Sequence, residues 1–148
     1  MTQSIDHDLL FKELLTTFFW DFLALFAPEV LEAAERDSLT FLTQEVFNDL
    51  PGQARRNVDI VAKLRFRGQE TCFLVHIENQ ATPQADFAAR MFLYFARLYE
   101  KYRLPIYPIA LFSYRSPQRP EPEIFLVAFP TKQILSNRIR LLLRSWRK

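Results

Sequence analysis

Two apolar, strand-like segments lie close together in the middle of the chain, at residues 58–64 and 73–80, and each carries an acid at its outer end. The polar joint between them contains Gly68, one of only two glycines in the sequence. Runs of β-branched and aromatic residues separated by a short glycine-containing joint predict an antiparallel hairpin. Because a hairpin pairs its two outer ends, this fold brings Asp59 toward Glu78.

Side-chain alternation along the second strand assigns its polar residues to one face. His76, Glu78 and Gln80 share that face, while the apolar residues between them point to the core. On the first strand, Asp59 shares a face with Val61. The pattern therefore predicts an oxygen-rich cluster on one side of a sheet, formed by Asp59, Glu78 and Gln80.

Hydrophobic spacing elsewhere predicts helices and further strands around this hairpin. The predicted helices cover residues 8–26, 29–36 and 86–102. The other predicted strands cover residues 39–42, 104–112 and 124–129. Pro105 and Pro108 restrict the strand at 104–112 to a sheet edge or to its first residues. This order predicts an α/β fold, with a mixed β-sheet flanked by helices.

Length and cysteine content indicate the number of domains and the expected location of the protein. A chain of 148 residues is long enough for one domain with a real core. Cys72 is the single cysteine, so no intramolecular disulfide forms, and a reducing, cytoplasmic location is expected. Residues 1–8 do not resemble a signal peptide, and Asp21 interrupts the apolar segment at 18–27, so no membrane is expected as a partner.

Basic residues concentrate at the end of the chain. The net charge is +2, yet the last eleven residues, 138–148, contain no acid, and the rest of the chain holds more acidic than basic residues. The basic residues of this segment are Arg138, Arg140, Arg144, Arg147 and Lys148. Such a segment is typical of a nucleic-acid contact, and a solvated terminal helix is an equally open interpretation.

The predicted acidic cluster has the chemistry of a metal site. Hard cations such as Mg²⁺ or Mn²⁺ take oxygen ligands, usually one or two carboxylates with waters and a substrate phosphate. Such a site can activate water and neutralise charge on a phosphodiester. The alternative is that Asp59 and Glu78 are exposed strand ends that pair with nearby bases such as Arg56 or Lys63.

The order of these residues resembles a known family. Asp59, then Glu78-Asn79-Gln80 on the next strand, then Pro83 and an aromatic helix resemble the Rpn/YhgA-like recombination-promoting nucleases, or putative transposases. These belong to the PD-(D/E)XK nuclease superfamily. Segments 8–15, 92–101 and 106–112 also look like that family, so the resemblance spans nearly the whole chain. It implies a restriction-endonuclease-like fold and a metal-dependent DNA endonuclease associated with recombination or transposition.

The resemblance also implies roles for individual residues. Asp59 and Glu78 would hold the metal, and Gln80 would position the attacking water. Relatives in the superfamily often have lysine at the place of Gln80, so this residue departs from the superfamily but not from the family. A lysine would offset developing negative charge, whereas glutamine offers hydrogen bonds without charge.

Four further residues have two interpretations each. Glu13 on the first helix is a candidate for an extra acid at the site, although an ordinary exposed helix charge is the favoured interpretation. His76 could act as a base, or be a structural hydrogen-bonding residue, which is favoured. Arg90 and Arg97 on the long helix could meet phosphates, and the favoured interpretation places both on its solvated face.

One departure from the family concerns the end of the chain. The family's members usually run longer, and the sequence after Pro130 does not look like their continuation. The expected division is therefore a nuclease-like domain over residues 1–130 and a basic C-terminal tail over 131–148, as in a truncated copy. The alternative to a working nuclease is a catalytically inactive remnant that binds DNA or oligomerises. A third class of function is a protein-interaction domain. A homodimer is one assembly that the sequence allows.

Overall fold

A five-stranded mixed sheet forms the centre of the protein in the computed structural model, which describes residues 7–42, 60–80, 86–112 and 124–143. The strands lie in the order β1-β2-β3-β4-β7. Their bounds are β1 (Thr40–Phe41), β2 (Ile60–Arg65), β3 (Cys72–Gln80), β4 (Ile106–Phe112) and β7 (Arg140–Leu143). Strands β1, β2 and β3 are antiparallel neighbours, whereas β4 runs parallel to both β3 and β7.

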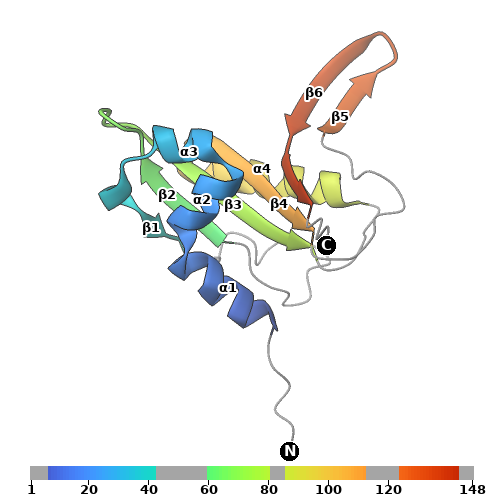
Figure 1. Ribbon diagram of the computed structural model, residues 1–148. Coiled ribbons are helices and arrows are strands. Elements are labelled where there is room, and N and C mark those ends of the chain that lie inside the picture. Colours follow the sequence, from blue (N-terminus) through green and yellow to red (C-terminus); the bar gives the residue numbers. More distant parts are fainter. Residues whose placement is uncertain (1–6, 43–59, 81–85, 113–123, 144–148) are drawn as a thin grey trace, which may run out of the picture.

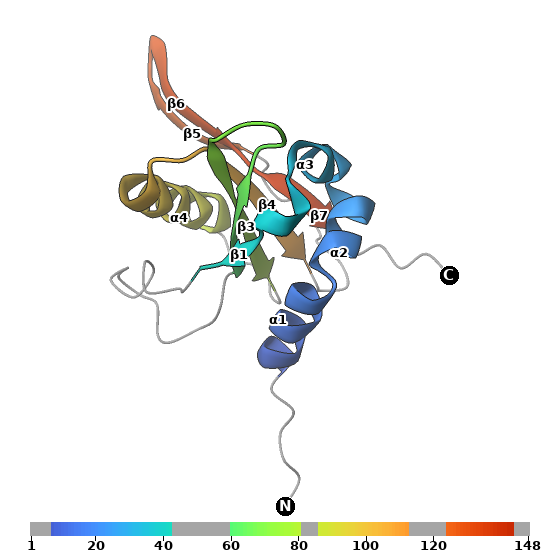
Figure 2. The same cartoon turned by 90° about the vertical axis from the view of Figure 1, so that its left-hand side faces the viewer.

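Helices cover both faces of this sheet (Figure 1). On one face lie α1 (His7–Thr17), α2 (Phe19–Phe26) and α3 (Pro28–Ala33). A short 3₁₀ turn, η1 (Arg36–Ser38), follows them in the chain and precedes β1. On the other face lies α4 (Phe87–Tyr102), which connects β3 to the parallel strand β4. Figure 2, turned by 90°, shows α4 and the α2–α3 pair on opposite sides of the strands. The predicted mixed α/β architecture is therefore confirmed.

The central hairpin forms as the sequence predicted. Strand β2 pairs with β3 in antiparallel register, from Ile60 opposite Ile77 to Arg65 opposite Cys72. The joint between the strands contains Gly68 with a φ of 70°, in the left-handed region that glycine adopts without steric cost. This turn fixes the register and so decides which residues of β3 face each helical layer.

Two hydrophobic cores lie on the two faces of the hairpin. Val75 and Ile77 pack in the cluster under α1–α3. Leu74 and Val61 pack under α4, together with Met91 of that helix. The predicted alternation is therefore confirmed. The residues of β3 on the same face as Leu74 lie beneath α4.

The predicted helix over residues 8–26 is two helices, α1 and α2, separated at Phe18. The hydroxyl of Thr16 donates hydrogen bonds to the carbonyl oxygens of Lys12 and Glu13, a contact that bends helices. Pro28 then occupies the first position of α3, where its missing N–H has no intrahelical partner to lose. The predicted helix over 29–36 therefore begins one residue earlier and ends at Ala33. None of the described helices is long and apolar enough to cross a membrane.

Strand β4 is not an edge strand, and its prolines lie at its beginning, which is the second of the two placements expected from the sequence. It lies between β3 and β7, but β7 pairs with it only from Ile109 to Phe112. Pro108 comes before this paired part, and Pro105 precedes the strand itself. The prolines are tolerated because the segment that contains them has a described neighbour, β3, on one side only.

The segment predicted to be a basic tail contributes two strands. Strands β5 (Ile124–Phe129) and β6 (Lys132–Arg138) form a separate hairpin that extends away from the main sheet (Figure 1). Strand β7 then joins the main sheet beside β4, and Ile139 is buried in the core under α4. The expected boundary at residue 130 is therefore not a structural boundary. The terminal-helix interpretation is wrong for residues 140–143, because this segment pairs with β4 as a parallel strand.

Candidate active site

Three polar side chains of β3 are buried beneath α4. The exposed fractions of His76, Glu78 and Gln80 are 0%, 5% and 4%. They share one face of the strand, as the sequence predicted, and they lie at the end of it that leads toward α4. Buried polar groups destabilise a fold unless they have partners, so the contacts of each one indicate its role.

Glu78 contacts His76 but keeps one oxygen without a hydrogen bond. The Nε2 atom of His76 lies 3.6 Å from Oε2 of Glu78, and the side chains are almost fully buried. This Oε2 accepts no hydrogen bond from any described residue. Leaving a buried carboxylate oxygen in this state costs on the order of 1–3 kcal/mol, and more for a charged group. Such an atom is suited to a cation or to a donor from a substrate.

The imidazole ring of His76 is held by α4. The ring meets that of Tyr94 edge to face, with centroids 5.6 Å apart and an interplanar angle of 83°. Tyr94 itself is 1% exposed. His76 therefore lies between the helix and Glu78 with no exposed surface of its own, and its role at the site stays a prediction.

Gln80 is contacted by a charged residue from α4. The Nη2 atom of Arg90 donates a hydrogen bond to Oε1 of Gln80. The guanidinium also lies over the ring of Phe87, 5.7 Å from its centroid. The expectation that Arg90 belongs to the solvated face of α4 is therefore wrong, because this side chain is half-buried and turned toward β3.

Arg97 behaves as its favoured interpretation expected. Its side chain is 43% exposed, and its Nη1 lies 3.5 Å from Oε2 of Glu100, one turn further along the helix. The two arginines of α4 thus have different environments, although they are only seven residues apart in the sequence. This contrast provides a natural control for experiments on Arg90.

A cationic side chain contacts Gln80 near the beginning of α4. Arg90 lies in the first turn of α4, which contains no acidic residue. The N-terminus of a helix carries a partial positive charge, so a cation in this turn is unfavourable unless a negative group lies nearby. The buried carboxylate of Glu78 is on the same face of β3 as Gln80 and supplies negative charge on this side of the sheet.

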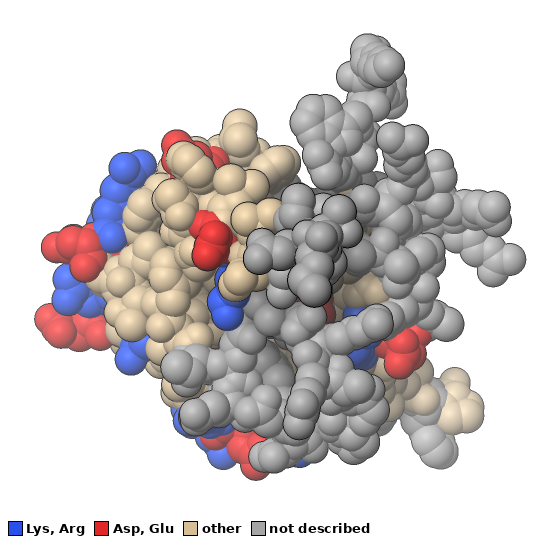
Figure 3. Space-filling model, turned by 90° about the horizontal axis from the view of Figure 1, so that it is seen from below, with Lys and Arg blue, Asp and Glu red and all other residues tan. Residues whose placement is uncertain are grey.

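Several predicted site residues lie outside the described residues. These are Asp59, Arg144, Arg147 and Lys148. Of the other basic residues, Arg138 is exposed at the end of β6 and Arg140 begins β7. On the face drawn in Figure 3, basic and acidic side chains of the described residues are interspersed, without a large patch of one sign.

Glu13 is exposed on α1, as its favoured interpretation expected. The same helix packs through Leu15 into the core on the face of the sheet opposite to Glu78. Within the described ranges, no group of three His, Cys, Asp or Glu side chains is close enough to hold a metal ion. The structure therefore brings His76 and Glu78 together, but not Glu13.

The described residues nevertheless fit one part of a Mg²⁺ site. Mg²⁺ in nucleotide-processing sites is held by one or two carboxylates, with waters and substrate phosphates as the other ligands. The non-hydrogen-bonded Oε2 of Glu78 can provide one such carboxylate oxygen. The amide of Gln80 can bind a water or phosphate oxygen beside it.

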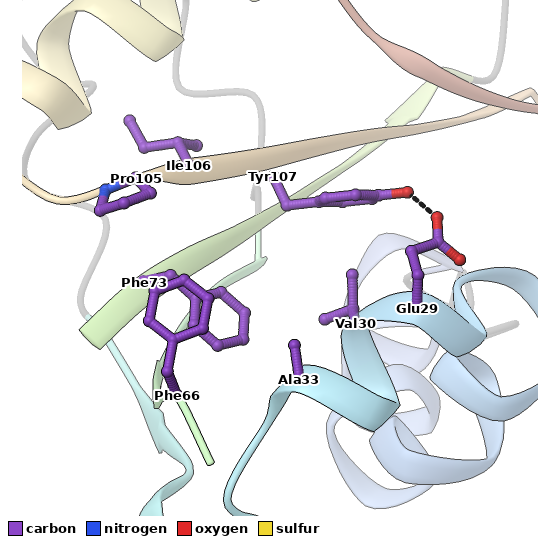
Figure 4. A pocket seen from close by; sticks show the side chains of 8 residues that line it. All are labelled: Glu29, Val30, Ala33, Phe66, Phe73, Pro105, Ile106 and Tyr107. Carbon is purple, nitrogen blue, oxygen red and sulfur yellow. Dashed lines mark hydrogen bonds between the residues drawn. The ribbon is translucent and has the colours of Figure 1, made fainter. Parts of the chain in front are cut away.

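A small pocket lies elsewhere, between α3 and the beginning of β4 (Figure 4). It has a volume of about 170 Å³ and is mostly apolar, with the rings of Phe66 and Phe73, tilted by 34° to one another, on one side. At its rim the hydroxyl of Tyr107 donates a hydrogen bond to the carboxylate of Glu29. Phe73 belongs to the core on the α1–α3 side, so this pocket is separated from Glu78 by the sheet.

The spacing of Arg90 along α4 places it at the border of the buried stripe. Arg90 is three residues after Phe87 and four before Tyr94, and both of these belong to that stripe. Arg97 is three residues after Tyr94 and lies at the same border, so the spacing does not distinguish the two arginines. The contact with Gln80 distinguishes them.

Comparisons of the chain with protein-family models, with curated proteins and with solved structures gave no significant match.

Proposed function

We propose that the protein is a metal-dependent DNA endonuclease with a restriction-endonuclease-like fold, as the resemblance to the Rpn/YhgA-like nucleases implies. The observation that supports this proposal best is the buried Glu78, whose Oε2 accepts no hydrogen bond from the described residues, beside the Gln80–Arg90 contact. A mixed sheet with helices on both faces is also the architecture that this resemblance implies.

The proposed metal ligands are Asp59 and Glu78. Asp59 lies outside the described residues, and its place as a ligand rests on the expectation from the sequence that the hairpin brings it toward Glu78. When bound, Mg²⁺ or Mn²⁺ supplies charge neutralisation for the phosphodiester and makes a water molecule more acidic.

The other residues of the proposed site have supporting roles. Gln80 donates a hydrogen bond from its amide to a water or to a phosphate oxygen. His76, which has no exposed surface and contacts both Glu78 and Tyr94, keeps the carboxylate in place rather than exchanging protons with the substrate. DNA is the proposed substrate, and the basic residues at the end of the chain are its proposed contacts.

Cleavage of supercoiled plasmid with Mg²⁺ tests this proposal. Nicked or linear product should form with the wild type, and should be lost with EDTA and in the Glu78→Gln variant. Glu100→Gln is a matched control, because Glu100 is an exposed glutamate on α4 that contacts only Arg97 among the described side chains. The proposal is wrong if a folded wild-type protein leaves the plasmid intact, or if Glu78→Gln cleaves like the control. Intact plasmid with retained DNA binding would favour the inactive DNA-binding module instead.

A further inference from the structure

Arg90 determines which way the amide of Gln80 faces. A guanidinium carries only donors, so the atom of Gln80 that it contacts has to be the amide oxygen. The NH₂ group of Gln80 is then at the other end of the amide and presents donors. Gln80 is 4% exposed and lies on the same face of β3 as Glu78.

Arg90 also supplies what glutamine lacks. A single lysine at position 80 would bring both a donor and a positive charge, whereas Gln80 brings only donors. In this protein the charge comes from Arg90, one turn into α4, at a helix end that is itself partly positive. The contact is a charge-assisted hydrogen bond that is partly shielded from solvent, which is the stronger kind.

We propose that Arg90 and Gln80 act together as a phosphate-binding pair beside Glu78. Arg90 is the positioning residue, which fixes the Gln80 amide and provides the positive charge. Gln80 is the residue that contacts the DNA phosphate through its NH₂ group. That the phosphate belongs to DNA rests on the proposed function. The charge and the orientation of the Gln80 amide rest on the hydrogen bond from Arg90.

Three single variants and one double variant test this pair by plasmid cleavage with Mg²⁺. Arg90→Gln should lower the cleavage rate about 10- to 100-fold, as expected for the loss of a charge-assisted hydrogen bond. Arg90→Lys keeps the positive charge but lacks the planar guanidinium, so its cleavage rate should lie between those of the wild type and Arg90→Gln. Arg97→Gln, two turns further along the same helix at a side chain that is 43% exposed, should cleave like the wild type.

The double variant separates function from folding. Gln80→Lys puts a cation directly at position 80, so Gln80→Lys/Arg90→Gln should recover most of the cleavage that Arg90→Gln loses. A purely structural role of Arg90 predicts no such recovery, because position 80 would not restore packing on α4. The proposal is overturned if Arg90→Gln cleaves normally, or if the double variant is no better than Arg90→Gln at equal thermal stability.

A binding measurement distinguishes failure of this inference from failure of the nuclease proposal. The probe is a short fluorescent DNA duplex in Ca²⁺, an oxygen-binding cation that replaces Mg²⁺ in this assay. Arg90→Gln should bind it about tenfold more weakly and with a smaller salt dependence, whereas Arg97→Gln should not change either. If the wild type binds the duplex more tightly than Arg90→Gln but does not cleave DNA, the nuclease proposal is wrong and the proposed phosphate-binding pair stands. Equal affinity of wild type and Arg90→Gln would overturn the pair even in a working nuclease.

Discussion

The rings of His76 and Tyr94 meet edge to face across the boundary between β3 and α4, with centroids 5.6 Å apart. The next contact along the same two elements joins Gln80 to Arg90. Because α4 returns against the direction of β3, the later residue of the strand meets the earlier residue of the helix. These two contacts together place α4 over the polar side chains of the strand and position the candidate site.

Removing the Tyr94 ring should destabilise the whole domain. Tyr94→Ala takes a 1% exposed aromatic out of the core and should lower the free energy of unfolding by about 3–5 kcal/mol. Tyr94→Phe keeps the ring against His76 and should cost about 1 kcal/mol. Urea denaturation measures both, with Tyr99→Ala as the control, since Tyr99 is 46% exposed on the same helix. A small effect of Tyr94→Ala would contradict the packing of α4 on β3.

Metal binding at Glu78 should be visible as stabilisation without any activity assay. A ligand that binds only the folded state at ten times its dissociation constant raises the free energy of unfolding by about 1.4 kcal/mol. Mg²⁺ should therefore raise the melting temperature of the wild type, but not that of Glu78→Gln. Glu100→Gln should respond like the wild type. An identical response in all three proteins would show that the ion does not bind at Glu78.

Glu78→Gln should itself fold at least as stably as the wild type in the absence of metal. The substitution removes a buried carboxylate whose Oε2 lacks a hydrogen bond, and functional residues of this kind commonly reduce stability. A gain of about 0.5–2 kcal/mol in the free energy of unfolding is expected. Chemical denaturation in EDTA measures it. A clear loss of stability would instead indicate that Glu78 has a structural role.

The basic residues at the end of the chain should be tested by substitution and not by truncation. Deleting residues 138–148 would remove β7 from the sheet and Ile139 from the core, so this variant should unfold. The triple variant Arg144→Gln/Arg147→Gln/Lys148→Gln leaves β7 intact. If all three side chains contact phosphate, the slope of log affinity for duplex DNA against log salt should fall by about 2.7. An unchanged slope would exclude this segment as the DNA contact.

The hairpin turn should depend on the backbone of Gly68. A methyl group at this position would meet no atom within 4 Å, so the cost of Gly68→Ala comes from its φ of 70° alone. We expect a loss of about 1–2 kcal/mol in thermal denaturation. Gly68→Asn should lose less, because asparagine adopts this conformation more readily. Equal losses would contradict a purely conformational cause.

The sequence alone determined the hairpin and the two faces of β3. The alternation of apolar and polar residues has a period of two, and a glycine marks the joint, so local chemistry is sufficient to predict both. That His76, Glu78 and Gln80 share one face follows from the same alternation, whereas their burial results from the packing of α4 on that face. The long helix α4 was equally predictable, since its apolar stripe is regular over its whole length.

The tertiary structure decided what the local patterns left open. The apolar run at 140–143 is too short to indicate its own neighbours, and it became a strand because the side of β4 beyond Pro108 was available for pairing. The contact between Arg90 and Gln80 depends on how α4 lies across β3, which no local pattern determines. A periodic sequence specifies which face of an element is buried, but the residue that faces it comes from another part of the chain and is fixed only when the layers pack.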